Sequence, residues 1–456
     1  MILWLELCLF WVCYKMKKVK EEKEKTENIN EKINKQERTL FLKNFIWNIL
    51  GTGFNSFNSL FFLIIVTWVN GVEQAGVYSI AYATALILYT VALYSGRLCQ
   101  VTDTENKVTD KDYIGNRIFT CIVTMVIAIV FAVFIQGYRD IKLWACILLT
   151  FYKATDALSE IFYGIMQKND ILYKSGQSLT IKSLLGLLVF LIVDIITKNL
   201  ILSIIASILV NVITILIFDI VIVKILVNKD EKFNKSNVFK ILKTDFFVFA
   251  NSFAGIYVLN APKYAIESYG TDELQAMFGY IIMPATVIIL FAQFVFMPFL
   301  NKLKNLYAEK NMKEFKKIAR NIKLAVVAFG IFAVGAGYII GPEVLKLIYG
   351  VEDLLNYRIH LAIILAAYIC YGISYVNLIL LTTTRDTFVQ FVIYVLTMGV
   401  AAVGSNVLVS KFLIDGAVMS CMLTLASQFI MYSVVTSVIL RKIAKKFEKE
   451  KEEVKG

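Results

Sequence analysis

Apolar stretches long enough to cross a lipid bilayer recur along the chain from about residue 40 onward. A membrane-spanning helix needs about 20 mostly apolar residues. Twelve such spans are predicted, at 45–69, 75–98, 116–136, 142–166, 174–196, 200–226, 244–266, 275–300, 321–341, 359–381, 387–409 and 412–440. Apolar residues make up 58% of the 456 residues and charged residues 18%, which excludes an ordinary soluble, disordered or fibrous protein. The pattern predicts an all-α polytopic membrane protein, because helices satisfy their own backbone groups in lipid.

Lysine and arginine are distributed unevenly among the connections between these spans. The connection between spans 1 and 2 has none, whereas the one between spans 8 and 9 runs from Lys302 to Lys323 and is densely basic. The even-numbered connections and both tails are the basic ones. Basic loops stay in the cytoplasm, so we expect a multi-pass protein with both termini cytoplasmic. The high Lys, Ile and Asn content suggests a bacterial source and therefore the bacterial cytoplasmic membrane. The net charge of +12 therefore orients the chain and predicts no nucleic-acid partner.

The two halves of the chain echo each other at an offset near 200 residues. Leu42-Lys43 and Leu242-Lys243 open spans 1 and 7, and Arg117 and Arg320 begin spans 3 and 9. The ordered matches predict a duplication into two pseudo-symmetric six-helix bundles, with substrate handled between them. The expected domains are a charged cytoplasmic tail at 1–39, bundles at 40–226 and 241–440, a linker at 227–240 and a basic tail at 441–456. Within the first tail, we expect Met16 to be the natural start; the alternative is an interfacial anchor formed by residues 1–14.

Three ionisable residues lie on one face of span 4. Lys153, Asp156 and Glu160 have i, i+3, i+7 spacing, so Lys153 can pair with Asp156. Glu160 would then meet another cation, Arg97 or Lys182. Charges at membrane depth are costly and mark ion pairs, relays or cavities. The cluster is either structural, or a proton or sodium relay using Asp156 and Glu160, or a polar cavity in which Arg97, Lys153 and Lys182 hold an anionic head group.

Asparagine and hydroxyl side chains form a second polar face, in span 1. Asn48, Thr52, Asn55 and Ser59 follow 4-3-4 spacing, which places them together on the helix. Such a stripe either bonds to a neighbouring helix or lines a cavity. We take Asn48 and Asn55 as cavity candidates.

Tyrosines share one face of span 10. Tyr368, Tyr371 and Tyr375 suit contacts with sugar rings and hydroxyls, and they also pack well between helices. Tyr368 and Tyr375 are further cavity candidates, although packing is the simpler interpretation.

No pattern in the sequence predicts a metal, a cofactor or an active site. The seven cysteines form no CxxC pair, His360 is the single histidine, and no nucleotide-binding motif is present. The longest outer connection, 341–358, has no pair of carboxylates suited to acid–base work. We therefore expect a non-enzyme that is driven by its substrate or by a Na⁺ or H⁺ gradient.

Several stretches resemble the polysaccharide repeat-unit flippases, members of the multidrug/oligosaccharidyl-lipid/polysaccharide exporter superfamily. GVYSIAYA at 76–83 is similar to the family's Gly-x-Tyr-Ser/Ala-x-Ala pattern. NAPKYAIESYGTDELQAMFGY at 260–280 resembles its Asn-x-Pro-Arg/Lys-Tyr element followed by Gly-x-Phe, with Ala276 in place of the usual glycine. The basic 301–323 connection and GPEVLKLIYG at 341–350 are also similar to the family. The resemblance covers residues 40–440.

The resemblance implies a V of two bundles that moves an undecaprenyl-diphosphate-linked oligosaccharide to the outer leaflet by alternating access, for capsule or other cell-surface polysaccharide. It also implies a basic cavity, for which Arg97, Lys153, Lys182 and Lys263 are available. Membrane lipids and a polysaccharide polymerase are the expected partners. Three alternatives stay open: a cation-coupled multidrug exporter of the same superfamily, a lipid II flippase, and an integral-membrane polysaccharide polymerase.

Overall fold

The computed structural model describes residues 38–453 apart from 41, 95, 103–107, 229, 297–298 and 385–386. The predicted charged tail and its start at Met16 lie outside these residues. Every regular element in the described part is helical.

The first bundle contains a first helix (Arg38–Asn70), α2 (Val72–Leu93), α3 (Gly96–Thr102), α4 (Asp110–Val130), α5 (Asp140–Lys168), α6 (Leu172–Thr197), α7 (Leu200–Thr214) and α8 (Ile220–Leu226). The linker helix α9 (Lys235–Thr244) follows. The second bundle contains α10 (Phe246–Tyr269), α11 (Asp272–Ile282), α12 (Thr286–Phe296), α13 (Leu300–Ala308), α14 (Met312–Tyr349), α15 (Arg358–Thr383) and α16 (Thr387–Glu453).

Each of the twelve predicted spans corresponds to a helix or a pair of helices. Among the described residues, nine helices are long and apolar enough to cross a membrane, and the bent pair α9 and α10 makes a tenth. The span predicted at 142–166 is α5, which has 29 residues and carries the ionisable residues of span 4. The spans predicted at 387–409 and 412–440 both lie within α16.

α16 is a hairpin of two antiparallel helices that reverses at Leu413, where φ is 50° and ψ is −121°. The Ser405 and Ser420 hydroxyls are 3.3 Å apart, and the rings of Tyr394 and Tyr432 are 6.0 Å apart. A straight helix would separate those two serines by about 22 Å. The basic tail predicted from residue 441 continues the second of these helices to Glu453, because its apolar positions pack against α13.

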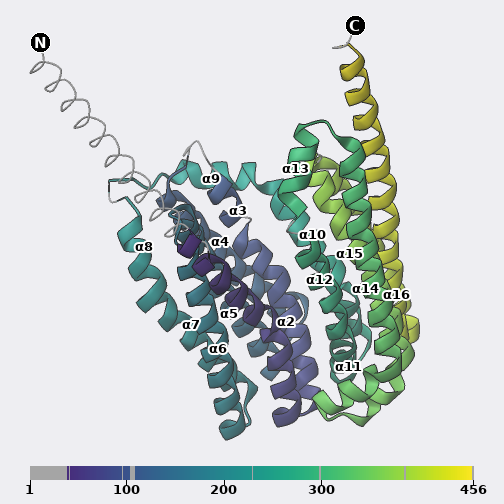
Figure 1. Ribbon diagram of the computed structural model, residues 1–456. Coiled ribbons are helices and arrows are strands. Elements are labelled where there is room, and N and C mark those ends of the chain that lie inside the picture. Colours follow the sequence, from purple (N-terminus) through teal and green to yellow (C-terminus); the bar gives the residue numbers. More distant parts are fainter. Residues whose placement is uncertain are drawn as a thin grey trace, which may run out of the picture.

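The linker helix is fastened to the first bundle. The Asp112 carboxylate, fully buried at the start of α4, accepts hydrogen bonds from the Asn234 backbone amide at 2.7 Å and the Asn237 side chain at 2.6 Å. α9 then bends by 57° into α10. Figure 1 shows α9 lying across the same end of the molecule as α13 and the C-terminal part of α16, which we call the basic end. The opposite end, where α10 is joined to α11, is the far end.

The largest core that the bundles share lies toward the far end, and a smaller one joins Leu88 of α2 to Phe253 of α10. The largest buried cluster mixes residues of both bundles, such as Leu63 and Tyr78 with Phe278 and Tyr280. Toward the basic end, separate clusters belong to each bundle, around Ile161 in the first and around Phe315 in the second. α2 and α10 keep contact there through Tyr94, whose ring stacks on Phe249 at 4.5 Å. The bundles are therefore closed at the far end and hold separate cores at the basic end.

Candidate transport cavity and buried ion pairs

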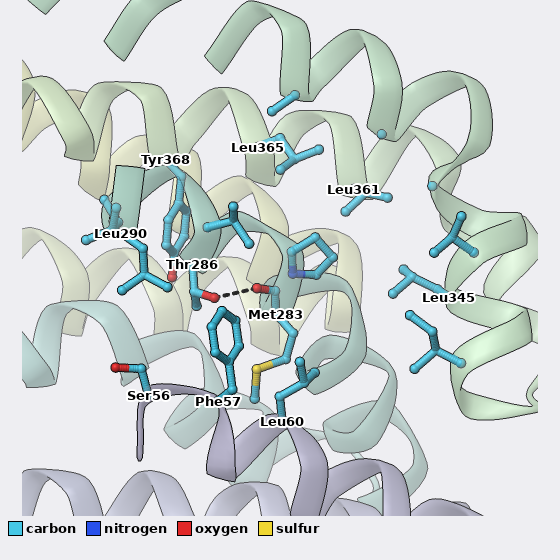
Figure 2. A pocket seen from close by; sticks show the side chains of 18 of the residues that line it. Ser56, Phe57, Leu60, Met283, Thr286, Leu290, Leu345, Leu361, Leu365 and Tyr368 are labelled. Atoms are coloured by element: carbon cyan, nitrogen blue, oxygen red, sulfur yellow. Dashed lines mark hydrogen bonds between the residues drawn. The ribbon is translucent and has the colours of Figure 1, made fainter. Parts of the chain in front are cut away.

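An apolar cavity of about 700 Å³ lies where the first helix meets the second bundle. Side chains from the first helix, α10, α12, α14 and α15 line it (Figure 2). Phe57, Leu60, Leu290 and Leu365 provide aliphatic and aromatic walls, and Gln293 is one of the few polar groups. Pro284 divides the span predicted at 275–300 into α11 and α12, joined by a short 3₁₀ turn. Thr286 begins α12, and its hydroxyl donates back to the Met283 carbonyl at 2.6 Å.

Of the tyrosine and asparagine residues predicted to line a cavity, one lines this cavity. Tyr368 lines the cavity together with Tyr371, whereas Tyr375 packs against a separate cluster toward the basic end. On the first helix, Ser59 lines the cavity. Asn48 and Asn55 are half-buried nearer the basic end and lie outside its lining.

Lys263 is a buried cation on α10, outside the lining of this cavity but in helix register with two residues of that lining. It follows Leu259 by four residues and Ile256 by seven, and both of those residues line the cavity. Positions with this spacing share one face of a helix. The Lys263 side chain is buried, with 7% of the residue exposed. Within the described residues it has no ion pair and no hydrogen bond. A buried ammonium without an anionic partner is costly, so an anion brought by a ligand would stabilise it.

The ionic residues of α5 are already neutralised within the first bundle. Lys153 pairs with Asp156 at 2.9 Å, as the sequence predicted. The Lys153 ammonium also lies 5.4 Å from the ring centroid of Tyr82 and 5.7 Å from that of Tyr89. The Asn211 amide donates to the second oxygen of Asp156 at 2.9 Å. Because Asp156 and the two tyrosine rings already stabilise the Lys153 ammonium, Lys153 is a weaker candidate for binding an anionic head group than the sequence alone suggested.

The predicted partner of Glu160 is Arg97. The Arg97 guanidinium reaches the Glu160 carboxylate at 2.7 Å and the Gln167 side-chain oxygen at 3.1 Å. Both side chains of the pair keep about a quarter of their surface exposed, at 27% for Arg97 and 23% for Glu160. The Arg97–Glu160 pair is more exposed to water than the Lys153–Asp156 pair or the pair formed by Lys182.

Lys182 has a partner that the sequence analysis did not name. Its ammonium lies 2.7 Å from the Asp219 carboxylate and also donates to the Ser159 hydroxyl. The Lys182 side chain is 3% exposed and that of Asp219 is 0% exposed. Asp219 ends a π-helical turn, Ile215–Asp219, that joins α7 to α8. A lone carboxylate inside the apolar span 200–226 was the signal available in the sequence.

Arg117 is a second residue whose role was missed, since the sequence analysis used it only to mark the start of span 3. It lies inside α4 and is 1% exposed. One guanidinium nitrogen donates to the Ala92 carbonyl at 2.9 Å. The other two have no hydrogen-bond partner in the described part of the chain. Arg117 therefore places a buried guanidinium beside Gly96 of α3, with two of its three nitrogens unbonded among the described residues.

Known transporters have this arrangement of helices. No family model matches the chain. It aligns over 90% of its length with a lipid II flippase, MurJ, in an inward closed conformation, with a TM-score of 0.68 and 13% identity, covering 90% of that chain. An inward-facing MATE family multidrug transporter of the MOP superfamily gives a TM-score of 0.67 at 11% identity, covering 87% of this chain and 99% of that one. The fold is that of the V-shaped MATE and MOP superfamily transporters.

Two further comparisons refine this result. An outward-facing MATE transporter gives a lower TM-score, 0.57, at 12% identity over 90% of this chain and 96% of that one. In sequence, the chain is 23% identical over 315 residues to the capsular polysaccharide biosynthesis protein CapF of Staphylococcus aureus, covering 68% of this chain and 78% of that protein. These structural neighbours are transporters and flippases, not enzymes.

Proposed function

We propose that the chain is a flippase for undecaprenyl-diphosphate-linked oligosaccharide repeat units, working by alternating access in capsule or cell-surface polysaccharide synthesis. The observation that carries the proposal is the pairing of a large apolar cavity with Lys263 on the same face of α10. Such a site suits an amphiphile with an apolar chain and an anionic head. Similarity to the capsular protein supports a saccharide-linked lipid. The basic end is then cytoplasmic, and the lipid-linked unit enters there.

The proposed orientation and partners follow from this function. Both termini face the cytoplasm of a bacterium, and a polysaccharide polymerase receives the translocated unit. A Na⁺ or H⁺ gradient drives the cycle if Asp156 or Glu160 is the coupling residue. Because those carboxylates are held by Lys153 and Arg97, the coupling ion would have to displace a cation. No catalytic role is proposed for any residue.

Deleting the gene in its host tests the function. The lipid-linked repeat unit is expected to accumulate on the cytoplasmic leaflet, and surface polysaccharide is expected to fall, until the wild-type gene is restored. Normal polysaccharide with increased drug sensitivity would assign the chain to multidrug export instead. Normal polysaccharide with blocked peptidoglycan synthesis would assign it to lipid II.

Filling the cavity is expected to slow transport of a lipid with an apolar chain. Leu290→Trp adds a large ring to the lining (Figure 2). The ring takes up volume that the apolar chain would occupy, so we expect a roughly fivefold lower rate in proteoliposomes loaded with lipid-linked oligosaccharide, a barrier higher by about 1 kcal/mol. Leu324→Trp is the matched control, because Leu324 is 58% exposed on α14. Equal rates for both variants would remove the cavity from the transport pathway.

A further inference from the structure

The far end of the molecule carries ion pairs that join the two bundles. Lys142, at the start of α5, lies 2.9 Å from the Glu267 carboxylate and 2.6 Å from the Asp272 carboxylate. Glu267 is near the end of α10 and Asp272 begins α11. The other ion pairs found among the described residues stay within one bundle. Lys142 is therefore the cation that links the bundles electrostatically.

Close helix packing surrounds this link. Any side chain at Gly76 of α2 would collide with the backbone carbonyl of Asp272, so the two helices touch there. One turn further along, a Cβ at Gly279 would lie 2.9 Å from the Ser79 hydroxyl. Small residues allow such a close approach of helices in a membrane. α2 and α11 thus form a tight seam immediately beside Lys142.

The same seam buries polar groups that have no partner. Both side-chain amide atoms of Gln275 and the Ser79 hydroxyl lack hydrogen bonds in the described part of the chain. Gln275 is 0% exposed and Ser79 is 3% exposed. Leaving a buried polar group unsatisfied is unfavourable, and water would satisfy these groups if the seam opened. These unsatisfied groups therefore favour an open seam, so another interaction must hold the seam closed.

Water reaches the link from the far end. A pocket of about 280 Å³ is lined by Lys142, Glu267 and Asp272 together with Glu73 and Glu273. Lys142 is the one cation in this lining, against four carboxylates. Without its charge, Glu73 on the first bundle would face the acidic residues of the second bundle across the pocket, and like charges would repel.

We propose that Lys142, Glu267 and Asp272 form the latch of an outer gate. The latch holds the bundles closed at the far end while the basic end is open, and it must separate when the cavity opens to the far side. It deepens the proposed alternating-access function and rests on it. The latch, however, concerns the conformation of the protein and not the identity of the substrate. Its failure and that of the flippase proposal can therefore be told apart.

The test measures the distance across the far end in the full-length protein. Spin labels are attached at Ile196→Cys and Asn356→Cys, both exposed, in a background without native cysteines and in lipid nanodiscs. Lys142→Ala is expected to raise the ratio of open to closed molecules by roughly tenfold, about the effect of losing one charge-assisted hydrogen bond. Asp272→Asn should shift the ratio in the same direction. Combining Lys142→Glu with Asp272→Lys should return it toward the closed value.

Lys346→Ala is the matched control. Lys346 pairs with Glu352 at 2.6 Å at the same end of the molecule, but both residues belong to the second bundle. Its removal should leave the distance distribution unchanged. The proposal is overturned if Lys142→Ala and Asp272→Asn both give the wild-type distribution, or if Lys346→Ala opens the far end as much as they do. Because no substrate is added, the result is independent of which lipid the protein moves.

Discussion

Lys263→Met is expected to lower the rate of translocation by roughly 10- to 150-fold, while Lys263→Arg should keep most of it. The range corresponds to losing one hydrogen bond to a charged group, about 1.5–3 kcal/mol. Lys263 is buried on the cavity face of α10 and has no anionic partner in the described residues. A diphosphate would supply that partner. The measurement is the flipping rate of a lipid-linked oligosaccharide in proteoliposomes.

The stability of the same variant separates binding from structure. Because no partner of Lys263 is left unpaired by the substitution, Lys263→Met should be as stable to heat as the wild type, or more stable. Lys198→Met is the matched control, since Lys198 is exposed at the far end of α6. Full transport by Lys263→Met would remove this residue from the substrate site. Loss of folding would instead assign Lys263 a structural role.

Asp219→Leu is expected to destabilise the protein by about 3–5 kcal/mol, the usual cost of leaving one member of a buried ion pair uncompensated. Lys182 would then be a buried ammonium held only by hydroxyl groups. Lys182→Met should have a similar effect, because it strands the fully buried Asp219. The double variant Lys182→Met with Asp219→Leu should recover most of the lost stability. The stability of the two single variants and of the double variant is measured by heating each protein and quantifying the folded fraction by size-exclusion chromatography.

This comparison also decides whether the buried pair serves transport. A stable double variant that transports normally makes the pair purely structural and withdraws Lys182 as a head-group ligand. A stable double variant with no transport makes the charges functional. The control removes the exposed pair of Lys317 with Glu314, 3.4 Å apart on α14, through Lys317→Met, which should change neither stability nor transport. If the double variant is as unstable as each single variant, the loss of stability does not come from breaking the ion pair.

Helix register made some of the contacts predictable. Lys153 and Asp156 are three residues apart on one helix, so their pairing depends on local geometry alone. The contact of Glu160 with Arg97 was predicted only as one of two choices, because it joins α5 to α3. The Lys182–Asp219 pair and the latch at Lys142 were not predicted. Their partners lie 37 residues and more away, and no periodicity links such positions.

The sequence by itself determined that this chain is a helical membrane protein and where its spans fall. Those properties follow from the local requirement that about 20 apolar residues satisfy their backbone bonds across lipid. Only the tertiary structure decided which charges are neutralised and which remain available. Lys153 and Lys182, two of the candidates for holding an anionic head group, are paired within the first bundle, whereas Lys263 and Arg117 form no ion pair among the described residues. The reason is physical: a charge's availability depends on its neighbours in space, and packing between helices sets those neighbours.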